Sequence, residues 1–143
     1  MHDRKLTIPD IRNRKNATPI AEVTAYDYPW ARLADQAGMD IELVGDSLGM
    51  VVLGYTDTVS VTMEEMIHHT RAVVRGVEHA LVVTDMPFGS CSSSIPAAID
   101  NAVRILKEGR ADAPNLPAAE TLPKPVAPMV APGLPVRGPM ALP

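Results

Sequence analysis

Ile41-Glu42-Leu43-Val44-Gly45-Asp46 is the stretch that decides the fold, because a short apolar run leads directly into a glycine and a carboxylate. A similar arrangement recurs in Leu81-Val82-Val83-Thr84-Asp85. Apolar runs of about four to eight residues rich in β-branched side chains are typical of buried strands in a parallel sheet. The segment of residues 20–26, earlier in the chain, has the same character. We therefore expect strands at residues 20–26, 41–44 and 80–83.

Helical patterns lie between and after the expected strands. Pro29 suits the first turn of a helix that runs toward Gly38, and Thr62 with Glu65 forms a T-x-x-E capping box at the start of a second helix. A third helical pattern covers residues 96–109. Strands that alternate with helices are typical of βα units on a parallel sheet, so we expect an α/β fold. Behind the capping box, apolar core residues recur at helical spacing: Met63, Met66, Ile67, Val73, Val74 and Val77.

The composition is that of an ordinary globular chain, with 46% apolar and 21% charged residues among 143. A net charge of −4, without basic clusters that interleave with aromatics, argues against nucleic acid and an anionic membrane surface as partners. No apolar run follows Met1, so we expect no signal peptide and no membrane span. Cys91 is the single cysteine and cannot form an internal disulfide, which favours a reducing, cytoplasmic location.

The front and rear of the chain differ in composition. All five aromatic residues precede residue 89, whereas the last 34 residues contain nine of the fourteen prolines. Proline removes an amide donor and restricts the residue before it, so a proline-rich segment does not favour regular strands and helices. We therefore expect βα units over residues 1–109 and an irregular continuation over residues 110–143.

Asp46 and Asp85 stand just past the carboxyl ends of two expected strands. In a βα barrel these strand ends meet on one face, where active sites are assembled. Paired carboxylates are a usual environment for Mg²⁺, because this small cation prefers oxygen ligands. Gly45 would let the backbone approach a ligand closely, and Ser47 adds a hydroxyl. The same spacing also fits two aspartates that cap helices or line loops, so both interpretations stay open.

Other polar and aromatic residues have simpler explanations. His68 and His69 lie on an expected helix without a second ligand at i+4, which favours structural roles. Cys91 lies in a serine-rich loop without a neighbouring base, so we expect an inert thiol. Tyr26 ends the first expected strand, where it could either reach the site or pack in the core.

Five motifs resemble, in the right order, the ketopantoate hydroxymethyltransferase (3-methyl-2-oxobutanoate hydroxymethyltransferase) family. The resemblance covers residues 6–109, and the succession of several motifs makes it specific. The motifs are Thr24-Ala25-Tyr26-Asp27-Tyr28, Leu43-Val44-Gly45-Asp46-Ser47-Leu48-Gly49-Met50, Gly54-Tyr55-Thr56-Asp57-Thr58, His68-His69-Thr70-Arg71-Ala72-Val73-Val74-Arg75-Gly76 and Asp85-Met86-Pro87-Phe88-Gly89-Ser90.

The resemblance implies a homo-oligomeric (βα)8 TIM barrel of the phosphoenolpyruvate/pyruvate superfamily, of which this chain carries the first half. It implies transfer of a hydroxymethyl group from 5,10-methylenetetrahydrofolate to 3-methyl-2-oxobutanoate. The product, 2-dehydropantoate (ketopantoate), serves pantothenate and coenzyme A biosynthesis. By the same resemblance Asp46 and Asp85 bind Mg²⁺, while Asp46, Ser47 and Asp85 bind the 2-oxo acid. Mg²⁺ on the substrate oxygens would act as a Lewis acid for the charge that develops when the C3 proton leaves.

Beyond Gly109 the chain departs from the family pattern Gly-Gly-Ala-x-Ala-Val-Lys-Leu-Glu-Gly-Gly. Asn115 occupies the position of a substrate-binding lysine, Pro117 that of an acidic residue of the metal site, and Pro139 that of a histidine. The general base of the family is expected beyond residue 143, so no catalytic residue is assigned. Two other hypotheses stay open: another 2-oxo acid mutase or lyase of the same superfamily, and an inactive fragment without a catalytic role.

We predict that the isolated chain has little or no hydroxymethyltransferase activity. General-base catalysis contributes roughly 10²–10⁴-fold in rate, and an asparagine in place of lysine offers a neutral hydrogen bond about half as strong as a charge-assisted one. The assay supplies 3-methyl-2-oxobutanoate, 5,10-methylenetetrahydrofolate and Mg²⁺ to the purified chain and measures ketopantoate. Turnover typical of the family, abolished by Asp46→Ala, would show that this expectation is wrong.

Overall fold

Four strands pair in parallel to form one sheet. The computed structural model describes residues 3–15 and 17–116, and the sheet order is β1-β2-β3-β4. Each strand pairs with the next one along the chain. Parallel neighbours joined by helices are βα units, so the predicted α/β architecture is confirmed. The strands are β1 Glu22–Thr24, β2 Ile41–Val44, β3 Leu81–Asp85 and β4 Ala113–Asn115.

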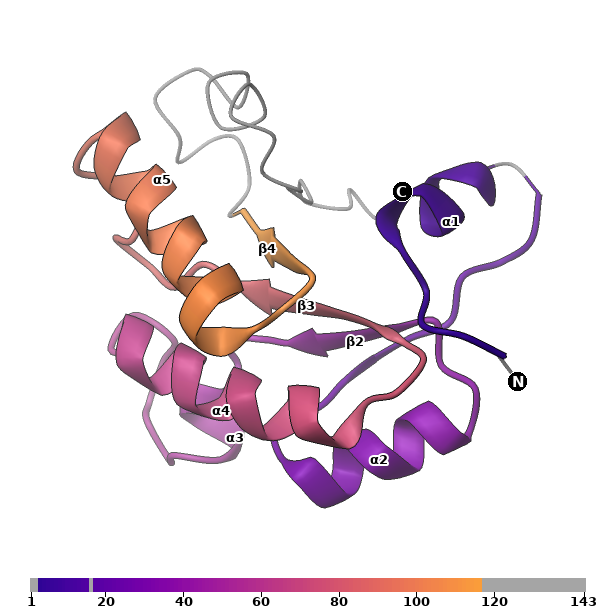
Figure 1. Ribbon diagram of the computed structural model, residues 1–143. Helices are drawn as coiled ribbons and strands as arrows, with labels where there is room; N and C mark the ends of the chain where they lie inside the picture. The colour runs from indigo at the N-terminus through magenta and orange to yellow at the C-terminus, as the bar shows by residue number, and fades with distance from the viewer. Residues whose placement is uncertain (1–2, 16, 117–143) are drawn as a thin grey trace.

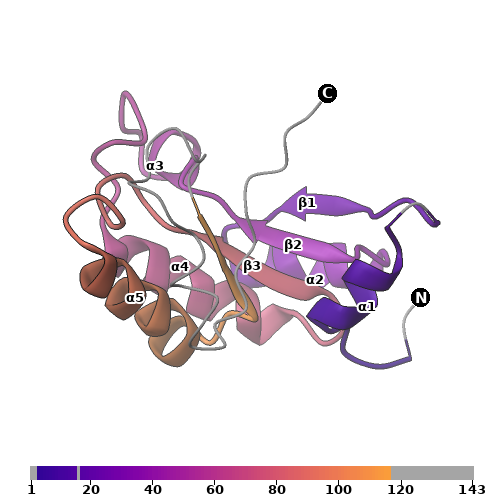
Figure 2. The same ribbon diagram turned by 90° about the horizontal axis from the view of Figure 1, so that it is seen from above.

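Helices lie on both faces of this sheet. Figures 1 and 2 show α2, α4 and α5 along one face and α1 on the other. One turn of π-helix, η1 Ile105–Gly109, continues α5 and ends at Arg110, whose φ of 64° lies in the left-handed region. No helix of the described residues is long and apolar enough to cross a membrane. The α-helices are α1 Ile8–Asn13, α2 Tyr28–Gln36, α3 Leu48–Val51, α4 Met63–Gly76 and α5 Ile95–Arg104.

Two helices begin where the sequence places their caps. The Glu65 amide donates to the Thr62 hydroxyl at 3.1 Å, and the Thr62 amide donates to the Glu65 carboxylate at 2.8 Å, which is the predicted capping box of α4. Pro29 is the second residue of α2. The Asp27 carboxylate caps that helix by accepting the Trp30 amide at 2.9 Å. Both predicted helix starts are confirmed.

The boundary expected at Gly109 lies too early, because β4 follows it. The expectation placed all of residues 110–143 outside the regular pattern, yet β4 pairs in register with β3. Pro114 lacks an N–H but pairs with Thr84 in the register, and bonds lie on either side of the paired residues: Asp112 N–H to the Val82 carbonyl and Met86 N–H to the Asn115 carbonyl, both at 2.9 Å. The expectation of irregular backbone over residues 117–143 lies outside the described residues.

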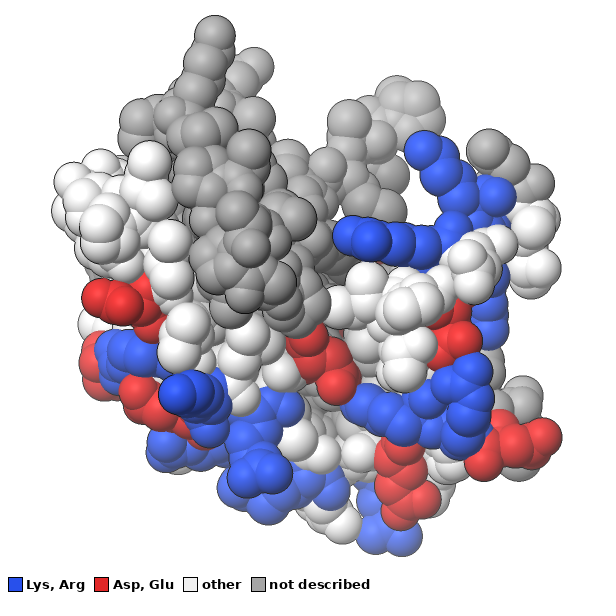
Figure 3. All heavy atoms as spheres, turned by 45° about the horizontal axis from the view of Figure 1, so that its top comes forward, with Lys and Arg blue, Asp and Glu red and all other residues white. Residues whose placement is uncertain are grey.

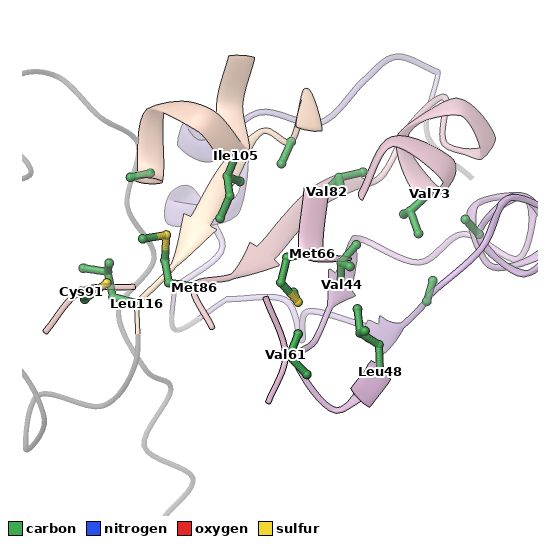
Figure 4. Close-up of a cluster of buried hydrophobic side chains, with 14 of the residues drawn as sticks. Val44, Leu48, Val61, Met66, Val73, Val82, Met86, Cys91, Ile105 and Leu116 are labelled. Carbon is green, nitrogen blue, oxygen red and sulfur yellow. The ribbon is translucent and has the colours of Figure 1, made fainter. Parts of the chain in front are cut away.

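Alternate residues of the strands face opposite sides of the sheet. Val44 and Val82 point toward the helices and pack with Met66, Val73 and other buried side chains of the large cluster in Figure 4. Met66 and Val73 therefore belong to the core, as their helical spacing predicts. Full burial of such a side chain stabilises the fold by roughly 1.5–3 kcal/mol. On the other face a smaller cluster joins strands and α1: Ile41, Leu81, Val83 and Ala113 pack with Ile8, Ile11 and Leu43.

Helices α2 and α4 meet at Gly76, where their backbones approach closely. A Cβ atom at Gly76 would lie 2.6 Å from the Tyr28 carbonyl oxygen and 3.0 Å from the Arg32 amide nitrogen. Backbone atoms cannot move aside as the tip of a flexible side chain can. Glycine is therefore required to keep α4 at this distance from α2.

Charged side chains of both signs are interspersed on the surface. On the face shown in Figure 3, Lys and Arg side chains lie beside Asp and Glu. Arg4 contacts Asp10 at 2.7 Å, and Arg104 contacts Glu108 at 2.8 Å. These exposed pairs are screened by water and salt, so they contribute little to stability.

Glu42, a residue of β2, is fully buried inside the protein. Its exposed fraction is 0%, and neither carboxyl oxygen has a hydrogen-bond partner among the described residues. It lies between Val23 and Val82 of the neighbouring strands. Burial, and secondarily the negative charge of Asp35, raises the pKa of Glu42 to about 8 against the opposing effect of Lys5. The side chain is thus a neutral acid at neutral pH.

We predict that Glu42 makes the fold less stable as pH rises from about 5 to about 8. Its pKa in the folded chain, about 8, lies above the ordinary value of 4.5, so the folded state binds this proton more tightly. The stabilising effect is fully present below the unfolded pKa and is lost as pH rises through the folded pKa. The loss is at most about 5 kcal/mol. Urea unfolding at these two pH values measures it.

The variant Glu42→Gln removes the ionisable group with little change in shape. Its free energy of unfolding should therefore fall less than that of the wild-type chain over the same pH range. Glu78→Gln changes an exposed glutamate and serves as the matched control, which should follow the wild type. An equal pH dependence in wild type and Glu42→Gln would contradict the prediction.

Candidate functional site

The ends of β2, β3 and β4 bring three polar residues together. Asp46 lies two residues beyond β2, Asp85 ends β3, and Asn115 ends β4 opposite Asp85 in the register. The Asp46 amide donates to Asp85 Oδ2 at 3.0 Å. The prediction that Asp46 and Asp85 meet at the carboxyl ends of neighbouring strands is confirmed.

The Asp85 carboxylate accepts hydrogen bonds at both oxygens. Oδ2 accepts the Asp46 amide, and Oδ1 accepts Asn115 Nδ2 at 2.7 Å. This second bond orients the Asn115 amide, because its nitrogen must face the carboxylate. The Asn115 Oδ1 atom is buried and has no hydrogen-bond partner in the described part of the chain. An acceptor oxygen is therefore available next to the two aspartates.

The Asp46 carboxyl has a raised pKa. Burial is the main cause, and the negative charge of Asp85 adds to it. Hydrogen bonds from the Thr58 hydroxyl and the Ser47 amide act in the opposite direction. The negative charges of two neighbouring carboxylates repel each other. A bound cation offsets this repulsion, so such a pair favours cation binding.

Neither aspartate is a helix cap, which was one part of the other interpretation of their spacing; the other part, a loop position, applies to Asp46, which lies in the turn after β2. The N-cap residue of α3 is Ser47, and that of α5 is Ser94. Asp85 belongs to β3 itself. The two carboxyl groups therefore lie at the strand ends and do not cap helices.

Ser47 turns its hydroxyl away from α3 and toward Tyr26. As N-cap residue of α3 it makes no side-chain cap hydrogen bond. Its Oγ instead lies 2.8 Å from the Tyr26 hydroxyl. Tyr26 also packs, partly buried, against the large core cluster, so both roles considered for it from the sequence apply. Its backbone carbonyl accepts a hydrogen bond from His69 Nδ1 at 2.8 Å, a structural role for that histidine, as expected.

Gly45 leaves room for this arrangement. A Cβ atom at residue 45 would lie 2.9 Å from Ser47 Oγ and 3.4 Å from Asp85 Oδ2. The absence of a side chain therefore allows the serine hydroxyl and the aspartate carboxylate to approach the same backbone segment.

Two contacts at this site carry no signal in the sequence. Thr58 bonds the Asp46 carboxyl from the loop before α4, and Asn115 bonds Asp85 from a strand that was expected to be irregular. Thr58 lies inside a quoted motif, but nothing in its spacing indicates the contact. In the sequence, Asn115 stands out only as a departure from a family pattern.

The oxygen atoms at the strand ends suit a small hard cation. The described residues contain no group of three or more His, Cys, Asp or Glu side chains that could hold a metal ion. The donors are therefore two carboxylates with neutral oxygens from residues such as Asn115 and Ser47. Mg²⁺ fits such a set, because it binds through one or two carboxylates and retains several waters.

Comparison with known proteins supplies the family. A family model described as ketopantoate hydroxymethyltransferase matches residues 5–142. The chain belongs to the ketopantoate hydroxymethyltransferase family. The match extends beyond residues 6–109, over which the motifs carry the resemblance. Asp46, Ser47 and Asp85 all lie within it.

Relatives named 3-methyl-2-oxobutanoate hydroxymethyltransferase are about half identical to this chain. The protein from Moorella thermoacetica is 53% identical over 139 residues, which cover 96% of this chain and 52% of that protein. The protein from Carboxydothermus hydrogenoformans is 50% identical, over 96% of this chain and 50% of that protein. The chain thus spans about half the length of these curated relatives.

Solved structures confirm the fold class. A phosphoenolpyruvate phosphomutase from Streptomyces platensis subsp. rosaceus superposes with a TM-score of 0.62 at 19% identity, over 83% of this chain and 40% of that one. A 2,3-dimethylmalate lyase of the PEP mutase/isocitrate lyase superfamily gives 0.61 at 15% identity, over 89% of this chain and 50% of that one. The described residues therefore have the fold of consecutive βα units of a TIM barrel, as the resemblance implied.

We predict that Gly45→Ala disrupts the strand-end site while the sheet still forms. The added methyl group must displace Ser47 Oγ, which would lie 2.9 Å away, at a cost of about 1–3 kcal/mol in the free energy of unfolding. Urea unfolding and Mg²⁺ titration of the variant measure both effects. In a Ser47→Ala background the same change should cost less, because the closest contact is gone. An equal loss of unfolding free energy in the two backgrounds would show that Ser47 Oγ is not the atom that Gly45→Ala displaces.

Proposed function

We propose that this chain binds Mg²⁺ and 3-methyl-2-oxobutanoate at the carboxyl ends of β2 and β3. The proposed reaction is hydroxymethyl transfer from 5,10-methylenetetrahydrofolate to give 2-dehydropantoate. The observation that carries the proposal is the contact between Asp46 and Asp85 within a chain of the ketopantoate hydroxymethyltransferase family. Asp46 and Asp85 are the proposed metal ligands, and Asp46, Ser47 and Asp85 the proposed substrate-binding residues.

The chain's own groups divide the work by charge and hydrogen bonding. Asp85 is held by the Asp46 amide and by Asn115, so its carboxylate presents a fixed orientation. Asp46 provides the second carboxylate, and Ser47 provides a hydroxyl that donates to an oxygen of the 2-oxo acid. When bound, Mg²⁺ would supply positive charge at the keto and carboxylate oxygens of the substrate. No general base is assigned among the described residues.

The wider setting of the reaction follows from the same proposal. Ketopantoate formation would place the protein in pantothenate and coenzyme A biosynthesis, with folate as the one-carbon carrier. We further propose a cytoplasmic homo-oligomer. Analytical ultracentrifugation of the purified chain tests whether it forms a homo-oligomer.

We predict that the chain binds 3-methyl-2-oxobutanoate only when Mg²⁺ is present. Isothermal titration calorimetry of the 143-residue chain, with and without Mg²⁺, measures this. Asp46→Asn and Asp85→Asn keep the shape but remove a negative charge, so each should weaken Mg²⁺ binding by at least about tenfold. Asp100→Asn changes an exposed aspartate of α5 and should leave both affinities unchanged.

The choice of small carboxylic acid ligand separates the competing hypotheses. Preference for 3-methyl-2-oxobutanoate over phosphoenolpyruvate and over 2,3-dimethylmalate supports hydroxymethyl transfer. Preference for one of the latter ligands would favour a mutase or lyase of the same superfamily. Absence of binding to any of them in a folded chain would favour a fragment without a catalytic role.

A further inference from the structure

The hydrogen bond between Tyr26 and Ser47 has two possible directions, and they have opposite consequences for a bound anion. The two oxygen atoms lie 2.8 Å apart, and either hydroxyl could be the donor. A hydroxyl has one hydrogen to donate. If Ser47 donated to Tyr26, only its lone pairs would remain to face a ligand oxygen. If Tyr26 donates, the Ser47 hydrogen is free.

We infer that Tyr26 is a positioning residue whose hydroxyl donates to Ser47 Oγ and so directs the Ser47 hydrogen toward an anionic oxygen of a bound 2-oxo acid. The inference rests on the proposed function, because it names the part of that site that recognises the substrate oxygen. Tyr26 acts through Ser47 and need not touch the substrate itself.

The backbone at Tyr26 is held by hydrogen bonds, and its ring packs against the large core cluster. The Tyr26 carbonyl accepts from His69 Nδ1 on α4 at 2.8 Å, and the preceding residue, Ala25, donates its amide to the Leu43 carbonyl of β2 at 3.0 Å. A carbonyl only accepts, so this bond requires the hydrogen on Nδ1 of His69. One neighbouring helix and one neighbouring strand therefore hold the backbone from which the tyrosine side chain extends.

The Ser47 hydroxyl is not engaged by α3 and has room to accept this bond. It makes no cap bond to α3, and the missing side chain at Gly45 leaves Oγ room beside Asp85. A phenol O–H is a stronger donor than an aliphatic hydroxyl, and an aliphatic hydroxyl oxygen is the better acceptor. The direction from Tyr26 to Ser47 to the ligand is therefore the favoured one, and each bond of such a chain polarises the next.

The donor direction can be measured without any ligand. Tyrosine labelled with ¹³C at Cζ reports on the phenol, because donation of its proton moves the resonance downfield, toward that of phenolate. Tyr26→Phe identifies the signal among the three tyrosines. In Ser47→Ala the Tyr26 signal should move upfield, since the acceptor is lost. A downfield shift, or no shift, would overturn the inference.

Substrate affinity tests the consequence of that direction. At saturating Mg²⁺, Tyr26→Phe should weaken binding of 3-methyl-2-oxobutanoate roughly 3- to 10-fold, the effect of one hydrogen bond. The affinity of Tyr26→Phe for Mg²⁺ alone should not change. A general structural defect would lower that affinity as well. Tyr28→Phe, on the exposed face of α2 where Arg32 donates to its hydroxyl at 3.0 Å, is the matched control and should bind as the wild type does.

A double-variant comparison isolates the action through Ser47. The double variant Tyr26→Phe/Ser47→Ala should bind the 2-oxo acid no more weakly than Ser47→Ala alone, because Tyr26 has no effect without the serine. Independent, multiplying losses would overturn the positioning role. If the wild-type chain does not bind 3-methyl-2-oxobutanoate, the proposed function fails, while the ¹³C shift in Ser47→Ala still decides the direction of the hydrogen bond.

Discussion

The carboxylate of Asp85 ties the carboxyl ends of three strands together, and the candidate site depends on it. One oxygen accepts the amide of Asp46 beyond β2, and the other accepts the side chain of Asn115 at the end of β4. Backbone pairing alone leaves the last residues of parallel strands free to fray. Here one side chain bridges them at the point where the chain leaves the sheet. The lack of a side chain at Gly45 leaves room for this approach, and the Ser47 hydroxyl lies beside it in contact with Tyr26.

The layers behind the site make this geometry rigid. Side chains of β2 and β3 are buried on both faces, by α2, α4 and α5 on one side and by α1 on the other. Helix α4 contributes most directly: it meets α2 at Gly76 without an intervening side chain, and its His69 holds the carbonyl of Tyr26. Groups that bind a ligand are thus positioned by packed elements, and the strand ends supply only the polar atoms.

The sequence predicted those parts of the molecule that depend on local patterns. Apolar runs that end in Gly45-Asp46 and in Asp85 located two strands and their carboxylates, and the Thr62–Glu65 box located α4. Long-range contacts were beyond such patterns: Thr58 reaches Asp46 through a loop whose path no periodicity specifies. Strand β4 was not predicted because Pro114 argues against a strand locally. Residues of β3 and just beyond it nevertheless form hydrogen bonds with this segment before and after Pro114. The roles of Asp46, Ser47 and Asp85 in binding metal and substrate stay predictions.

The neutral acid inside the sheet alters the charge that the folded molecule carries. The formal net charge of −4 counts every glutamate as ionised. With a pKa of about 8, Glu42 retains most of its proton at neutral pH, so on this account the folded chain is nearly one unit less negative than the formula. Unfolding at neutral pH then releases about one proton to the solution. Calorimetric enthalpies of unfolding will accordingly contain the ionisation heat of whichever buffer takes up that proton.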